Sequence, residues 1–346
     1  MIVVEGLFLL AGLNSGGGEQ SPDVPPALVA NLHSDFAMFR RDLSSEPGVN
    51  LIGASVVSDE YPGGEIGGRF AFWWFGWPSE ARQTVLSRAL AQIQFIDQVA
   101  ATSQGVTLIR TRKDLERVQS QHSVGLLLWM EGADPIVGDP SRVRLFYEHG
   151  VRAIMLTHLY NNALAGSSSP SIPLTNFYWG SDPGLSDQGR TVLVEMAKYG
   201  MIVDLAHASR KTFDDVLAAW SGPVIVSHAA MAAIFPSPRN LTDEQVRAIA
   251  GRNGIIGIMG QTQFLGGKRL ADLADHIAHA VAIGGVDHIA LGLDMEDAVN
   301  TMPEDFHDTR DLPELASLVR QRGLAEEDVR EIFGLNAFRF FSRVLR

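Results

Sequence analysis

Two histidines, His207 and His228, each follow a short apolar run rich in Val and Ile. Such runs are typical of buried parallel strands. The intervening residues 211–220 space their apolar side chains as an amphipathic helix does. The carboxyl ends of strands carry the chemistry in parallel α/β folds. Two imidazoles at equivalent strand ends therefore favour a metal site over two structural histidines.

Three further polar residues, Glu131, His158 and Asp294, also end predicted strands. One carboxylate with two imidazoles is an adequate ligand set for a catalytic zinc ion and leaves a coordination position for water. We therefore predict one zinc ion bound by Glu131, His207 and His228. Asp294 is placed to accept a proton from water and return it to a leaving group. We expect His158 to act as an electrophile or as a hydrogen-bond donor to a carbonyl.

Arg239 lies in a predicted loop at the same end of the fold, close in sequence to His228. The planar fork of a guanidinium suits the carboxylate of a small substrate, so we predict a substrate-binding role for Arg239. Five other histidines lie in predicted helices or loops, where we expect them to be solvated and without a role: His122, His149, His276, His279 and His307.

Eight apolar runs alternate with predicted helices without a break in composition. We place the strands at residues 1–10, 50–57, 124–130, 151–157, 201–206, 223–227, 254–259 and 288–293, with a short extra strand at 106–109 and a helix at 27–43. This alternation predicts a single (β/α)8 TIM barrel over residues 1–346. The glycine-rich residues 12–18 match neither a dinucleotide-binding turn nor a P-loop, which argues against a doubly wound sheet.

Two long loops are expected at the rim, at about residues 58–78 and 160–184. The first is rich in glycine and contains Trp73, Trp74 and Trp77. Two interpretations are open for these tryptophans: a loop packed on the barrel rim, or an apolar wall of the substrate pocket.

Composition narrows the class of protein. The chain of 346 residues has a net charge of −12, which argues against nucleic acid or an anionic membrane as partner. It contains no cysteine, so disulfides and thiolate zinc sites are excluded. The apolar run at 6–13 follows Glu5 rather than Lys or Arg and is too short to span a bilayer. We expect a soluble, cytoplasmic protein without a signal peptide that acts on a small-molecule substrate.

With these residues assembled, the chain from about residue 2 to its end resembles the renal (membrane) dipeptidase family of zinc-dependent amidohydrolases. The resemblance implies a (β/α)8 fold and hydrolysis of dipeptides or related small amides, often in a homodimer. Glu131-Gly132 is similar to the bridging-glutamate motif of the family, and Leu156-Thr157-His158 to its substrate-contacting histidine strand. Asp204-Leu205-Ala206-His207 and Ser227-His228 resemble the segments that carry its second-metal histidines, and Pro238-Arg239-Asn240 resembles its carboxylate-binding arginine motif. Leu293-Asp294 is similar to the position of its catalytic aspartate, and Gly334-Leu335-Asn336 with Arg339 resembles its C-terminal helix signature.

Family members begin with a strand that ends in a His-x-Asp pair, and two registers are possible for it here. In one, His33 and Asp35 are this pair and complete a second metal site. In the other, residues 1–10 form the first strand, and Leu7 and Leu9 stand at the ligand positions. We favour the second register, because residues 1–10 form the more apolar run. In this second register Asp35 caps a helix, and we expect one bound zinc ion, with two as the alternative.

The leading hypothesis is a metal-dependent hydrolase of a dipeptide or a related small carboxylate-bearing amide. One alternative is a different reaction, such as a lyase or tailoring step, on the same scaffold, because a fold does not determine a reaction. A second is a catalytically silent binding protein.

Overall fold

Eight parallel strands close into a barrel in the computed structural model, which describes residues 28–346 except 62–63, 169–181 and 296–300. Going round the barrel the order is β1, β2, β4, β5, β6, β7, β8 and β9, and β9 pairs with β1. A ninth strand, β3, pairs with the first residues of β4 outside the barrel. The strands are β1 Ala30–Ser34, β2 Leu51–Val57, β3 Val106–Leu108, β4 Val124–Glu131, β5 Val151–Met155, β6 Ile202–Asp204, β7 Val224–Ala229, β8 Ile255–Ile258 and β9 Ile289–Leu291.

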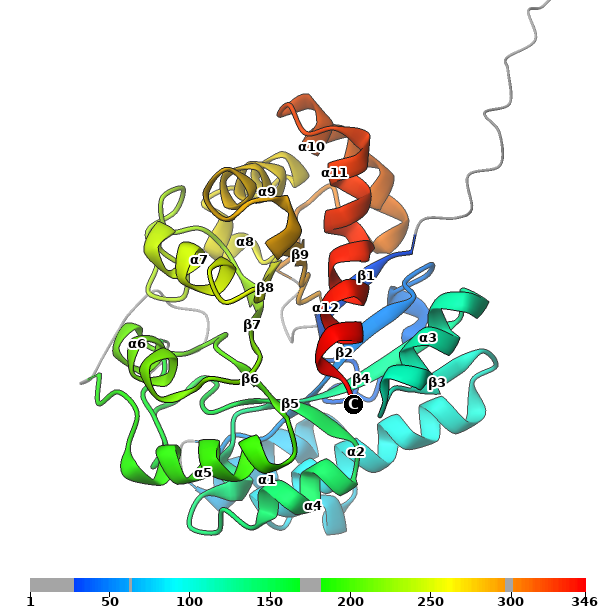
Figure 1. Ribbon diagram of the computed structural model, residues 1–346. Coiled ribbons are helices and arrows are strands. Elements are labelled where there is room, and N and C mark those ends of the chain that lie inside the picture. The colour runs from blue at the N-terminus through cyan, green and yellow to red at the C-terminus, as the bar shows by residue number, and fades with distance from the viewer. Residues whose placement is uncertain (1–27, 62–63, 169–181, 296–300) are drawn as a thin grey trace, which may run out of the picture.

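Helices surround the strands, as Figure 1 shows. They are α1 Glu65–Trp74, α2 Val85–Thr102, α3 Arg112–Gln121, α4 Arg142–Glu148, α5 Asp187–Lys198, α6 Arg210–Ala219, α7 Asp243–Ala250, α8 Thr262–Leu265, α9 Leu270–Gly284, α10 Leu312–Gln321, α11 Glu326–Arg330 and α12 Asn336–Val344. The predicted (β/α)8 TIM barrel is confirmed. Within the described residues, none of these helices combines the length and apolar character that a membrane span requires.

The first barrel strand is not where the sequence placed it. Residues 27–43 were expected to form a helix, but they contain β1, which pairs with β2 and β9. The reason lies in buried polar groups: the Asn31 side chain accepts a hydrogen bond from Leu293 N (2.8 Å) and donates one to Glu46 (2.9 Å). A strand that buries polar side chains inside the barrel lacks the apolar pattern by which strands are recognised. Residues 1–10, predicted as the first strand, lie outside the described residues.

The expected rim loop at 58–78 contains a helix, α1, which begins after Gly64. Gly64 has a φ of +61°, a left-handed conformation that glycine adopts without strain. Trp77 is buried, and its indole donates to Met38 O (2.9 Å). Trp73 and Trp74 lie on the outer face of α1, 56% and 71% exposed. The packed-loop interpretation therefore holds for Trp77 alone.

Candidate metal centre

Polar side chains from seven barrel strands meet at the carboxyl end of the barrel. His33 belongs to β1, Glu131 to β4 and His228 to β7. The others follow their strands: Asp35 after β1, Asp59 after β2, His158 after β5, His207 after β6 and Asp294 after β9. All five residues predicted for the metal and the chemistry, namely Glu131, His158, His207, His228 and Asp294, are thereby brought together.

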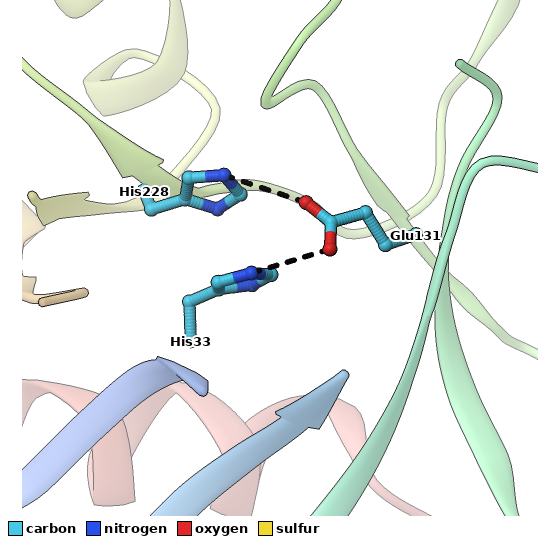
Figure 2. A group of neighbouring side chains, drawn as sticks. All are labelled: His33, Glu131 and His228. Atoms are coloured by element: carbon cyan, nitrogen blue, oxygen red, sulfur yellow. Dashed lines mark ion pairs between the residues drawn. The ribbon is translucent and has the colours of Figure 1, made fainter. Parts of the chain in front are cut away.

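Glu131 is the centre of this group, because its two carboxylate oxygens face different partners. Oε2 lies 3.4 Å from His33 Nε2 and accepts a hydrogen bond from Ser55 Oγ at 2.8 Å. Oε1 lies 3.3 Å from His207 Nε2 and 3.6 Å from His228 Nε2. Figure 2 shows the imidazoles of His33 and His228 each directed at a different oxygen of Glu131. The carboxylate thus stands between two groups of possible metal ligands.

The first group surrounds His33 Nε2. This nitrogen lies 3.5 Å from Asp35 Oδ1 and 3.8 Å from Asp294 Oδ1, besides its approach to Glu131. The structure therefore contradicts the favoured register: His33 and Asp35 end the first barrel strand and face the centre. Asp35 was expected to cap a helix and instead takes part in the site.

The second group surrounds Glu131 Oε1 and consists of His207, His228 and His158. His207 has a φ of +61°, in the left-handed region where a non-glycine residue is strained. Its Nε2 lies only 2.8 Å from His228 Nε2. Two ring nitrogens at this distance must share a proton or face a common cation, and a backbone strained to bring them together indicates a functional site.

The donor set fits a bound divalent cation. Three groups of side chains bring their ligand atoms within 4.8 Å of one another: His33, Glu131 and His228; Glu131, His158 and His207; and His33, Asp35 and Asp294. Among the residues that the structure describes, no hydrogen-bond partner is found for four buried atoms: both ring nitrogens of His33, Asp35 Oδ1 and His207 Nδ1. Buried polar atoms without partners are rare and need an explanation such as an ion. Imidazole nitrogens and carboxylate oxygens are suitable ligands for zinc and similar metals.

The charges and burial of the centre favour a carboxylate surrounded by imidazoles. Burial alone raises the pKa of Glu131, but the neighbouring His158 and His33 outweigh it and hold this pKa well below its usual range. Burial lowers the pKa values of His207 and His228 far below normal, which keeps these imidazoles neutral, the form that binds metals. Burial raises the pKa of Asp294 to about 7, which suits a group that accepts and returns a proton near neutral pH.

A network behind the ligands fixes two of the strand ends. Asp204 at the end of β6 accepts hydrogen bonds from the Trp129 indole (2.8 Å) and from Ser227 N (3.0 Å). The Ser227 hydroxyl lies 2.9 Å from His228 Nδ1. A partner on the second ring nitrogen orients a ligating histidine, so His228 is held with Nε2 toward the centre.

Arg239 reaches the site from the loop between β7 and α7. It is buried, and its Nη2 donates to His228 O (2.8 Å). Burial lowers its pKa to about 10, which leaves the guanidinium charged at neutral pH. The structure thus places a buried cation beside the second group of ligands.

Sequence reasoning missed Asp59 and underrated His33 and Asp35. The available signals were the His-x-Asp spacing of residues 33–35 and a carboxylate two residues beyond a predicted strand. His276 was expected to be solvated, yet it is fully buried: Nδ1 accepts from Met231 N (2.8 Å), and Nε2 lies 3.1 Å from Leu265 O.

Comparisons with known proteins agree with this geometry. Residues 34–345 match the family model described as membrane dipeptidase (peptidase family M19). This chain belongs to that family. It is 30% identical over 268 residues to the dipeptidase verJ of Clonostachys rogersoniana, covering 77% of this chain and 67% of the relative. It is 31% identical over 236 residues to the dipeptidase tcpJ of Claviceps purpurea, covering 67% of this chain and 53% of the relative. The chain therefore spans about half to two thirds of the length of these dipeptidase relatives.

A solved metallopeptidase of Rhodobacter sphaeroides, liganded with a phosphinate mimic of the dipeptide L-Ala-D-Ala, superposes with a TM-score of 0.77. The match covers 92% of this chain and 100% of that one at 22% identity, so it shows the shared fold. Membership of a metallopeptidase family implies a metal cofactor, and the His and Glu groups of this barrel are suited to hold one.

Proposed function

We propose that this protein of the dipeptidase family hydrolyses a dipeptide or a related small carboxylate-bearing amide at a centre of two divalent cations. One observation carries the two-metal proposal: the oxygens of Glu131 face separate groups of ligands. His33 and Asp35 would hold one cation with Glu131, and His207 and His228 the other. This replaces the single-zinc expectation, which depended on a helix at residues 27–43.

When bound, the cations would supply Lewis-acid chemistry, polarising a carbonyl and activating water. The protein's own residues do the rest. Asp294 lies 3.8 Å from His33 Nε2 and 4.0 Å from His228 Nε2, so it faces both ligand groups and can move a proton from water to the leaving nitrogen. Arg239 binds the substrate carboxylate, and His158 donates a hydrogen bond to the carbonyl.

We assign zinc as the metal because neutral imidazoles and carboxylates are its common ligands in catalytic sites. We also propose a homodimer. The exposed face of α1, with Ile66, Phe70, Trp73 and Trp74, supports it, because an apolar patch of this kind is commonly covered by a partner. Sedimentation of the purified chain at micromolar concentration tests this assembly.

Elemental analysis together with a dipeptidase assay tests the proposal. Purified full chain should contain about two equivalents of zinc and release both amino acids from dipeptides. The double variant His33→Ala/Asp35→Ala should lose about one equivalent, and His207→Ala/His228→Ala the other. His149→Ala, at an exposed histidine beyond α4, is the control and should lose none.

Two results would contradict the proposal. If His33→Ala/Asp35→Ala bound as much zinc as wild type, the proposed first cation site would be refuted. A metal-free, inactive wild type would favour the silent binding protein.

A further inference from the structure

Asp59 is a buried carboxylate at the centre, and neither the sequence motifs nor the proposed chemistry accounts for it. It follows β2 and is 2% exposed. A carboxylate loses its hydration on burial, which is costly unless a cation or hydrogen-bond donors replace the lost water. In the described part of the chain, one ion pair is found for Asp59: its Oδ2 lies 2.7 Å from His158 Nδ1.

This contact determines which ring nitrogen of His158 faces the reaction. Nδ1 points at Asp59, and Nε2 lies 3.5 Å from Glu131 Oε1. A carboxylate paired with one nitrogen of an imidazole holds the orientation of the ring. Nε2 is then the atom presented to the centre.

The local backbone is built for this pair. The peptide N–H of Ser58 donates to Glu131 O (2.9 Å), and the Ser58 hydroxyl donates to Gly132 O, so the chain just before Asp59 is tied to the end of β4. Gly132, with a φ of +82°, makes room: a Cβ there would lie 2.9 Å from Asp59 Oδ1 and 3.3 Å from the Cβ of His158. The glycine thus permits the close packing of both residues.

We propose that Asp59 is the positioning residue of His158, and that its carboxylate holds the imidazole by Nδ1 so that Nε2 meets the substrate. The inference rests on the proposed function for the identity of that substrate, a small amide. The groups of described side chains that could hold a metal do not include Asp59, so in this proposal its removal should impair turnover and leave the metals in place.

The first experiment compares Asp59→Ala with wild type in the zinc-loaded full chain. We expect kcat/KM to fall about 10- to 100-fold, as when the partner of an active-site histidine is removed, with the loss in kcat and both metal equivalents retained. Asp59→Asn keeps an oxygen that can accept from Nδ1, so it should recover much of the activity. The control Glu60→Gln removes the adjacent exposed charge and should stay within about twofold of wild type.

A double-mutant cycle decides whether Asp59 acts through His158. In a His158→Ala background, adding Asp59→Ala should change kcat by less than about twofold, because residues that act as a unit are non-additive. Independent, multiplicative losses would overturn the proposal. Loss of a metal equivalent in Asp59→Ala would also overturn it, because Asp59 would then support the metal centre directly.

A crystal structure of Asp59→Ala gives a readout that does not need activity. The His158 ring should turn away from Glu131 or become disordered, whereas an unmoved ring would refute positioning by Asp59. If wild type cleaves no dipeptide, the proposed function fails, and the position of the ring still tests the role of Asp59.

Discussion

At the scale of single residues, we propose two roles for the guanidinium of Arg239. One donor holds His228 O, and a guanidinium has further N–H groups for a substrate carboxylate. Because Arg239 is buried, its contact with His228 O is shielded from water, and the proposed contact with a substrate carboxylate would be shielded as well. Lysine offers a single ammonium and cannot reproduce this fork.

Arg239→Ala should therefore raise the activation free energy that kcat/KM reports by about 2–4 kcal/mol, the usual loss when one member of a buried charge pair is truncated. Arg239→Lys should recover only part of this loss. Kinetics on a dipeptide with a free carboxylate measures this, and a substrate amidated at that carboxylate should be much less affected. Zinc content should stay unchanged. It is measured as a control because Arg239 also donates to the backbone carbonyl of His228, a proposed metal ligand. Full activity of Arg239→Lys on the free carboxylate would show the assignment to be wrong.

At the scale of elements, α9 is joined to the loop after β7 by a neutral histidine. His276 Nδ1 accepts from Met231 N, which requires that this nitrogen carry no proton. Burial lowers the pKa of His276 below its ordinary value of 6.5. The unfolded chain therefore binds a proton at this residue at a higher pH than the folded chain does, and stability is lost as the pH falls below about 6.5.

His276→Gln should reduce this pH dependence, because glutamine can accept from Met231 N and does not titrate in this range. The Tm of wild type should drop between pH 7.5 and pH 5 by more than that of the variant. His149→Gln, at an exposed histidine, should follow wild type. Equal slopes in wild type and His276→Gln would show that His276 does not contribute.

At the scale of the whole molecule, the barrel closes where its first strand, β1, pairs with its last strand, β9. The strand pairing of β1 with β9 has a single register pair, Asn31 with Leu291. The side chain of Asn31 adds the hydrogen bond from Leu293 N and a donor to Glu46. It therefore supports the closure between the strands that carry His33 and Asp294.

Asn31→Ala should lower the free energy of unfolding by about 1–3 kcal/mol, because the buried Leu293 N–H loses its partner. Urea titration measures this, and activity should fall with it. Gln94→Ala, at an exposed position of α2, is the control and should stay within about 0.5 kcal/mol of wild type. No difference between Asn31→Ala and this control would show that closure does not depend on the side chain.

The sequence alone determined most of the barrel and half of the metal centre. Seven barrel strands carry apolar runs that are recognisable because both sides of each strand are buried in apolar surroundings. Glu131, His158, His207, His228 and Asp294 each end or follow such a run, so finding the strands also found these residues. Arg239 was found from its position close in sequence to His228.

Only the tertiary structure decided the first strand, and with it the other half of the centre. Asn31, His33 and Ser34 are buried polar residues whose environment is supplied by Glu46, Glu131 and the chain beyond β9. Partners so distant in sequence leave no local periodicity, so residues 27–43 resemble an amphipathic helix. The same holds for Asp59, whose partner His158 is brought to it by barrel closure. A local pattern reports which side chains avoid water, but the pairing of buried polar groups depends on the whole fold.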